Sequence, residues 1–367
     1  MTLLLSTFSM CNKIMKVSNN MVVVWYDFDC KNFDIYGVNS NFHRLPEKFA
    51  ASVSDGVAAN AKYPAGGRIR FATNSENIHI KTIMKGTKGI GFDLFRLENG
   101  SEIFAAGFRK PEYFICDGGF ETGVCASKDK EMHSYTINFP YFGEIEDFKL
   151  GIDEGAILKK GEKYKNEKPV AFYGSSITHG AWVTRPGSAY VPMISQKYNL
   201  NYLNFGFAGS AKGETPLIEY IAKLDISAFV SDYDHNAYDI ELLKATHLNM
   251  YKTVRKYKPS VPYIIITKPD YWTDPKNNDK RNKIMYATYE YAKQNGDNRV
   301  YFIDGKTLFG GEYYQNCTKD GCHPNDLGAY RMAQKIGPVV AKAIGIEKKI
   351  LHDCLYKETS YEKSRKK

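Results

Sequence analysis

The sequence predicts a two-domain α/β protein: a β-sandwich, jelly-roll-like, followed by a three-layer α/β/α domain with a mainly parallel sheet. Three observations predict this fold. The chain has 367 residues, more than one average domain. From residue 21 to 158 the apolar residues recur with period two between frequent turns. From residue 169 onward, short apolar runs alternate with helical patterns, as in parallel sheets that are covered by helices.

The first region contains five runs that we expect to be strands of a sandwich. Turn signals rich in glycine, asparagine and proline separate these runs, for example at residues 64–67 and 98–100. A mixed α+β domain is the alternative interpretation. The expected strands are 21–26, 68–72, 77–83, 91–97 and 134–139.

The second region reads alternately as strand and helix. The run at 263–267 is almost purely apolar, which is typical of a parallel strand covered on both faces. The expected strands are 170–174, 202–205, 226–230, 263–267 and 299–303. The expected helices begin at 188 and then span 215–222, 240–257, 278–294 and 327–343.

A polar, charged run separates the two patterns, and we place the domain boundary there. The predicted organisation is an uncertain N-terminal extension (1–20), a β-sandwich domain (21–158), a linker (159–168), an α/β domain (169–350) and a basic tail (351–367).

The charge and cysteine content narrow the function classes. The net charge is +9, but most of the excess lies in the runs 159–168 and 357–367, so we expect no nucleic-acid partner. The seven cysteines form no C-x-x-C pair, which is typical of reduced thiols. The N-terminus has no basic region before its apolar run, and no apolar segment reaches membrane-span length. We therefore expect a cytoplasmic protein without a membrane partner, and a secreted protein is the alternative.

Polar or glycine-rich loops follow the predicted parallel strands. Because the carboxyl ends of such strands meet at one edge of the sheet, these loops can form a single site. Ser176 follows the first strand, Gly209 the second and Asn236 the third, while Asp320 and His323 precede the last helix.

These residue types supply each role that acyl transfer needs. Ser176, at a strand-to-helix turn, suits a nucleophile, and His323 suits its general base. Asp320 lies three residues before His323 and can orient the imidazole. Gly209 can offer a backbone N–H, and Asn236 a side-chain amide, to the oxyanion.

Each of these residues also has a purely structural interpretation. Ser176 could be a helix N-cap, and Asp320 and His323 could cap the last helix. Gly209 could be a turn glycine and Asn236 an Asx turn. What favours catalysis is that loops at one sheet edge supply all the roles together.

We predict neither a cofactor nor a metal. Acyl transfer of this kind needs no cofactor. Cys317, Cys322 and His323 lie close in sequence, but their spacing matches no standard zinc ligand set. The aromatic residues Trp182, Tyr271 and Trp272 follow strand ends, and they could line a pocket or pack in the core.

The loops resemble the sequence blocks of the SGNH (GDSL-like) hydrolases. Ser176, Gly209 and Asn236 fall on the serine, glycine and asparagine of the first three blocks, and Asp320-x-x-His323-Pro matches the final D-x-x-H-P block. The resemblance covers about residues 169 to 346. The chain departs from the family at Ser175 and Ala237, where an aspartate is usual.

A second resemblance concerns the first region. Residues 42–46 and 91–95 look like the β-sandwich of a two-domain subgroup with a G-x-D-L-Y signature. That subgroup is associated with carbohydrate esterases that remove acetyl groups. An α/β-hydrolase is disfavoured, because the turn at 174–178 lacks the second glycine of the nucleophile elbow.

The candidate residues predict a serine esterase that hydrolyses short-chain acyl esters, and the resemblance implies O-acetyl groups on carbohydrates in particular. The expected partner is a small-molecule or oligosaccharide ester. A thioesterase or lysophospholipase that uses the same site is one alternative. A non-catalytic glycan-binding protein is another. The sequence leaves the oligomeric state open.

Overall fold

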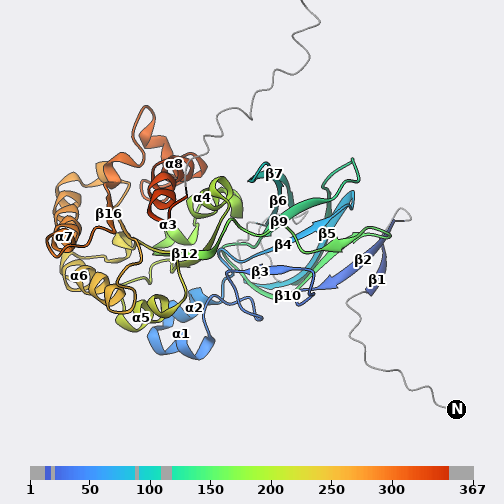
Figure 1. The fold of residues 1–367 in the computed structure, drawn as a ribbon, viewed down its shortest axis with the longest axis horizontal. Coiled ribbons are helices and arrows are strands. Elements are labelled where there is room, and N and C mark those ends of the chain that lie inside the picture. Colours follow the sequence, from blue (N-terminus) through green and yellow to red (C-terminus); the bar gives the residue numbers. More distant parts are fainter. Residues whose placement is uncertain (1–12, 18–20, 87–90, 109–117, 347–367) are drawn as a thin grey trace, which may run out of the picture.

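The computed structural model describes residues 13–17, 21–86, 91–108 and 118–346, which form a β-sandwich joined to an α/β domain (Figure 1). The predicted fold class is confirmed. The tail at 351–367 and most of the 1–20 extension lie outside the described residues. Among the described helices, none combines the length and the apolar content that crossing a membrane would require.

Two antiparallel sheets make the sandwich, and their apolar faces enclose one core. The first has the order β1-β2-β10-β5-β8, with β1 (Lys13–Val17), β2 (Met21–Asp27), β5 (Asn77–Lys85), β8 (Gly118–Cys125) and β10 (Glu144–Asp153). The second has the order β11-β4-β9-β6-β7, with β3 beside β4; its strands are β3 (Asp34–Tyr36), β4 (Arg68–Thr73), β6 (Phe92–Glu98), β7 (Ser101–Phe108), β9 (His133–Asn138) and β11 (Leu158–Lys159).

The α/β domain has a five-stranded parallel sheet with the order β13-β12-β14-β15-β16. Its strands are β12 (Asn166–Gly174), β13 (Leu200–Gly206), β14 (Ala228–Asp232), β15 (Tyr263–Ile266) and β16 (Val300–Ile303). Its helices are α3 (Ser176–His179), α4 (Tyr190–Tyr198), α5 (Thr215–Lys223), α6 (Ile240–Tyr257), α7 (Pro275–Gln294) and α8 (Asp326–Ala343). Short 3-10 turns are η1 (Pro186–Ser188), η2 (Asp234–Asn236), η3 (Tyr271–Thr273), η4 (Gly305–Thr307) and η5 (Tyr314–Cys317).

Apolar side chains cover both faces of this sheet. One core includes side chains of α5, α6 and α7, and the other includes side chains of α4 and α8. The buried parts of the strands are mostly apolar for this reason, and β15 (Tyr-Ile-Ile-Ile) is completely buried. The layers leave the carboxyl ends of the strands to the loops.

Two helices of the first region pack on the second. α1 (Glu47–Val53) and α2 (Asp55–Ala61) lie beneath the α/β domain beside α5 (Figure 1). Ala50 and Val57 belong to the same buried cluster as Leu217 and Ile218 of α5. The sequence pattern predicts neither helix, because each is only seven residues long and buries few side chains.

Buried arginines also join the two regions. The guanidinium of Arg44 donates to the carbonyls of Asn204 and Gly206 at the end of β13. Arg68 donates to Tyr202 O and to the Asn201 side chain. The run at 159–168, predicted as a linker, supplies the last residue of β11 and the first residues of β12. The two regions therefore share a polar, buried seam.

Candidate active site

The turn after β12 presents Ser176 at the first position of α3. The side chain of Ser175 accepts a hydrogen bond of 3.2 Å from the Ile177 N–H and so caps this helix. Gly174 is required by space, because a Cβ there would overlap the side chain of Thr178. Ser175 thus has a local role at the position where an aspartate is usual.

A continuous chain of hydrogen bonds links three of the predicted site residues. Ser176 Oγ lies 2.8 Å from His323 Nε2, and His323 Nδ1 lies 2.8 Å from Asp320 Oδ2. The other carboxylate oxygen of Asp320 accepts the N–H groups of Cys322 (3.0 Å) and His323 (2.8 Å). Burial opposes ionisation of Asp320, but the hydrogen bonds from His323 and Cys322 outweigh it and lower the pKa of Asp320. This geometry can move a proton from a hydroxyl to an imidazole.

Gly209 and Asn236 lie on loops that are hydrogen-bonded to the turn before Ser176. Asn236 Nδ2 donates to Phe207 O at 2.8 Å, and the Phe207 N–H donates to Gly174 O at 2.9 Å. Gly209 has φ = +72°, a conformation that favours glycine, and no atom within 4 Å would contact a Cβ there. Within the described residues, no hydrogen bond joins Ser176 directly to Gly209 or Asn236. The loops that carry Gly209 and Asn236 are therefore adjacent, and the space beside Gly209 is unoccupied by other atoms of the described residues.

A buried carboxylate beneath the turn is absent from the sequence-based prediction. Asp232, the last residue of β14, accepts hydrogen bonds from Thr178 Oγ1 (2.9 Å) and Tyr190 OH (3.0 Å). Burial raises the pKa of Asp232 to about 6. Its side chain fastens α3 and α4 to the sheet edge. The sequence signal that could have identified it is the Ser-Asp pair at the end of the short apolar run Ala-Phe-Val.

A second histidine–aspartate pair lies near Asn236. His235 Nε2 is 2.9 Å from Asp270 Oδ1, and the other carboxylate oxygen is 3.7 Å from Lys268 Nζ. Burial would lower the pKa of His235, but the hydrogen bond to Asp270 and the nearby Cys322 outweigh it and raise that pKa to about 10. Burial would likewise raise the pKa of Asp270, yet the bond to His235 lowers it to about 2.

This second pair and the Cys322 thiol offer three metal-ligand atoms within 4.8 Å of one another. The donor types are those that zinc accepts. However, His235 and Asp270 already neutralise each other, and Lys268 adds a positive charge beside the carboxylate. We therefore interpret the cluster as a buried ion pair.

Two tryptophans near the loops have different surroundings. Trp182 is 47% exposed, its ring lies 6.0 Å from that of His323, and Lys319 Nζ lies 4.0 Å above it. Trp272 is partly buried and packs against Phe309. Of the two tryptophans, only Trp182 is both exposed and close to His323.

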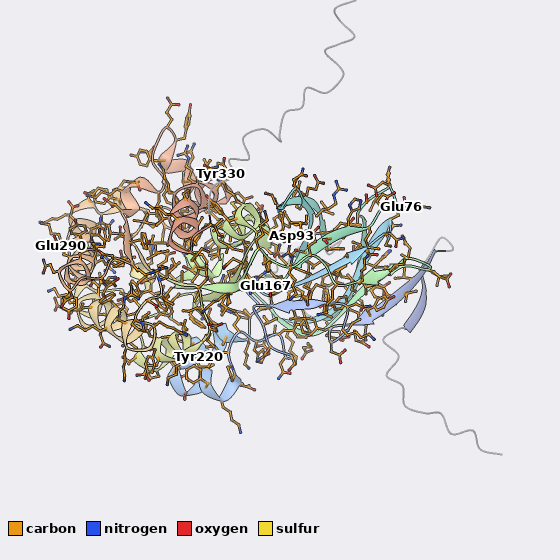
Figure 2. The ribbon with its side chains drawn as sticks, in the orientation of Figure 1. Glu76, Asp93, Glu167, Tyr220, Glu290 and Tyr330 are labelled. Carbon is orange, nitrogen blue, oxygen red and sulfur yellow. The ribbon has the colours of Figure 1, made fainter. Side chains whose placement is uncertain are left out.

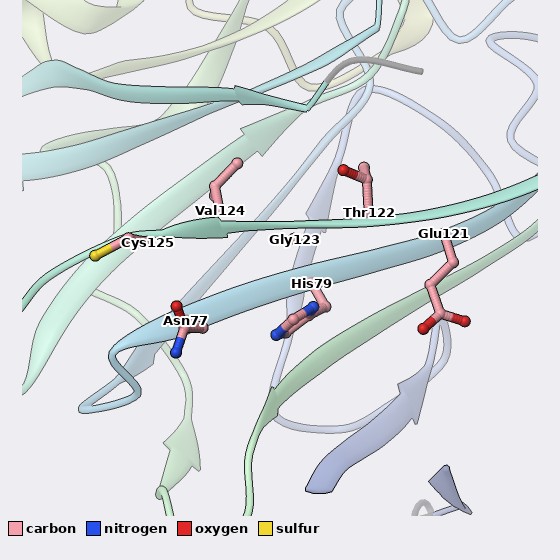
Figure 3. Close-up of a pocket in the computed structure, with 7 residues that line it drawn as sticks. All are labelled: Asn77, His79, Glu121, Thr122, Gly123, Val124 and Cys125. Carbon is pink, nitrogen blue, oxygen red and sulfur yellow. The ribbon is translucent and has the colours of Figure 1, made fainter. Parts of the chain in front are cut away.

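A hollow of about 230 Å³ lies elsewhere, on the β-sandwich. Figure 3 shows it across β5 and β8, and Asn77, His79 and Glu121 are among its lining residues. It contains none of the residues of the hydrogen-bond chain. The candidate active site is therefore defined by its side-chain geometry and not by this hollow.

Two family models match consecutive parts of the chain. Residues 167–341 match the GDSL-like lipase/acylhydrolase family. Residues 23–158 match the GxDLY domain, which is the N-terminus of SGNH-hydrolase-type esterases. No curated protein matches the sequence.

Several solved structures share the whole arrangement. A protein of Bacteroides ovatus ATCC 8483 described as a GDSL-like lipase has a TM-score of 0.77 at 24% identity, over 89% of this chain and 99% of its own. The salicylyl-acyltransferase SsfX3 of a tetracycline biosynthetic pathway has a TM-score of 0.71 at 16% identity, over 88% of this chain and 97% of its own. A family two carbohydrate esterase from Cellvibrio japonicus has a TM-score of 0.59 at 9% identity, over 89% of this chain and 99% of its own. These likenesses show the fold. The two consecutive family models identify the chain as a member of the GDSL-like lipase/acylhydrolase family, a two-domain esterase with a GxDLY N-terminal domain.

Proposed function

We propose that the chain is a serine esterase that removes short acyl groups, in particular O-acetyl groups on carbohydrates. The observation that carries the proposal is the unbroken hydrogen-bond chain from Asp320 through His323 to Ser176. The carbohydrate part is supported by the Cellvibrio japonicus relative, which is a carbohydrate esterase.

The first half of the reaction forms an acyl-enzyme. Ser176 Oγ attacks the ester carbonyl while His323 Nε2 takes the hydroxyl proton. Asp320 accepts the Nδ1–H and so keeps the imidazole in the tautomer whose Nε2 faces the serine. His323 then gives its proton to the departing alcohol oxygen, and the C–O bond of the ester breaks.

Three N–H groups would stabilise the negative charge on the carbonyl oxygen. They are the backbone N–H groups of Ser176 and Gly209 and the second amide hydrogen of Asn236, whose first is used by Phe207 O. Each such donor contributes roughly 3–4 kcal/mol to transition-state stabilisation. In the second half, His323 activates a water molecule, which releases the acid and regenerates Ser176.

The adjacent serines allow a matched test with p-nitrophenyl acetate. Ser176→Ala should lower kcat/KM by roughly 10³-fold or more, because the nucleophile is lost. Ser175→Ala should keep most of the activity and lose about 1 kcal/mol of stability, because only the cap of α3 is removed. Equal rates for Ser176→Ala and the wild type would contradict the mechanism.

The substrate class is tested separately. Acetate release from acetylated oligosaccharides should exceed butyrate release from butyrylated ones. A preference for long acyl chains would favour a thioesterase or lysophospholipase instead. A serine-reactive phosphonate should label Ser176, and failure to label would favour a non-catalytic glycan-binding protein.

A further inference from the structure

One segment links the candidate active site to the β-sandwich. It runs from Trp182, beside His323, to Gly187 in η1. Trp182 has φ = +74°, a backbone conformation that large side chains adopt only when the surroundings impose it. The segment must therefore be held at both ends if Trp182 is to keep its place.

Near the catalytic side, α8 holds the segment. The carboxylate of Asp326, in the first turn of α8, accepts the Thr184 N–H at 2.8 Å and also the Thr184 hydroxyl. α8 directly follows the loop that carries His323. This contact fixes Trp182 relative to the general base that we propose.

At the other end the anchor is Asp93, the aspartate of the G-x-D-L-Y-like run in β6. Asp93 lies where the sandwich meets the α/β domain (Figure 2). Its side chain is fully buried, and it accepts the Gly187 N–H at 2.7 Å and Arg185 Nη1 at 3.3 Å. Its other oxygen accepts Asn138 Nδ2 at 2.9 Å. Two of these three partners belong to the segment.

The contact is also close in space. A Cβ on Gly187 would overlap the ring of Phe95, so the backbone approaches β6 directly. The guanidinium of Arg185 lies 4.0 Å above the ring of Phe104 on β7. The sandwich therefore contacts the segment through the carboxylate of Asp93, the ring of Phe104 and the close approach of Phe95 to the Gly187 backbone.

We propose that Asp93 is a positioning residue for the esterase reaction: it holds the segment 182–187 so that Trp182 forms a wall of the acyl pocket beside His323. This inference rests on the proposed function. It assigns the β-sandwich a part in substrate selection, since the wall stays in place only while the sandwich holds it.

The test compares variants of the full chain by their kcat/KM for p-nitrophenyl acetate and butyrate. Asp93→Asn should lower the acetate-to-butyrate ratio by about fivefold or more, because a displaced wall admits the longer chain. Asp153→Asn is the matched control. That carboxylate also binds a backbone N–H, of Asn77, but entirely within the sandwich. It should lower stability and leave the ratio unchanged.

A double-mutant cycle shows whether Asp93 acts through Trp182. Trp182→Ala should lower the ratio in the same direction, and Asp93→Asn should add little in its presence. If Asp93→Asn does not fold, Thr184→Val loosens the same segment from an exposed position and should also lower the ratio.

An unchanged ratio in Asp93→Asn, or in Thr184→Val where Asp93→Asn is not folded, would overturn the inference. So would an equal change in Asp153→Asn, or additive effects of Asp93→Asn and Trp182→Ala. These outcomes presuppose an active wild type whose activity depends on Ser176. A wild type that hydrolyses neither ester would instead contradict the proposed function.

Discussion

Two aspartate–histidine pairs lie in loops around the carboxyl edge of the parallel sheet, and their hydrogen bonds are of similar length. Asp320 and His323 are 2.8 Å apart, with side chains 41% and 23% exposed. Asp270 and His235 are 2.9 Å apart, with side chains 5% and 8% exposed. Length therefore does not distinguish the two pairs, and their surroundings do.

The surroundings assign different chemistry to each histidine. His323 has its second nitrogen on Ser176 Oγ, so it can accept a proton from a substrate-facing group. The His235 ring is buried, with its Nε2 on Asp270 and the Cys322 side chain nearby, and it faces no hydroxyl nucleophile among the described residues. With a pKa of about 10, His235 is already protonated at neutral pH and cannot act as a base. The buried pair is suited to holding the loops together.

The largest expected effect separates the histidines. His323→Gln should lower kcat/KM by roughly 10⁶-fold with little change in stability, because it removes the base from a partly exposed loop. His235→Gln should cost about 3 kcal/mol of stability, because Asp270 stays buried and keeps only Lys268, 3.7 Å away, as a charged partner. Activity assays and urea unfolding on both variants check this. A larger activity loss in folded His235→Gln than in His323→Gln would reverse the two roles.

A smaller effect is expected at the aspartate of the exposed pair. Asp320→Asn should lower kcat/KM by roughly 10⁴-fold, less than His323→Gln, because the histidine remains as a base but loses the carboxylate that sets its tautomer. The backbone N–H groups of Cys322 and His323 should still find an acceptor in the asparagine oxygen. Steady-state hydrolysis of p-nitrophenyl acetate measures the loss, and a loss equal to that of His323→Gln would contradict this ranking.

The smallest expected effect is a pH dependence of the stability, which the buried pair of His235 and Asp270 should cause. The pKa of His235 is raised from 6.5 to about 10, so its stabilising contribution is complete below pH 6.5 and is lost as the pH rises through 10. The pKa of Asp270 is lowered from 3.8 to about 2, so its contribution is lost as the pH falls through that range. Urea midpoints of the wild type should therefore decline between pH 6.5 and 10.

His235→Gln should flatten that alkaline decline. A surface pair in the sandwich, Asp129 with His133 at 2.9 Å, provides the control. His133→Gln should leave the decline as it is in the wild type. A decline that persists undiminished in His235→Gln would show that another group causes it.

The sequence predicted what depends on local pattern. The helix expected at 240–257 is α6, and the five expected parallel strands are β12 to β16. Asp320 and His323 could be paired because a three-residue spacing alone brings their side chains within reach. The four sequence blocks came from the resemblance to a known family, which the order of these loops along the chain carries.

The features that the sequence did not predict depend mostly on residues that are distant in the sequence. Strands β7 and β8 were not predicted, because their glycines and mostly solvent-accessible side chains give no clear alternation of apolar residues. His235 and Asp270 are separated by 35 positions, and Asp93 and Gly187 by 94. Only the folded arrangement of the sheets identifies such pairs, so the buried ion pair and the interdomain anchor could not be predicted.

Helices α1 and α2 have a consequence for how the protein is made. They belong to the first part of the chain, yet their apolar side chains, such as Ala50 and Val57, are covered by α5. The ring of Phe49 stacks on Tyr220, 4.5 Å away. During synthesis these helices emerge long before residues 215–223 do, and they must wait with an uncovered apolar face. A nascent chain that stalls between the two regions would therefore be prone to aggregate or to need a chaperone.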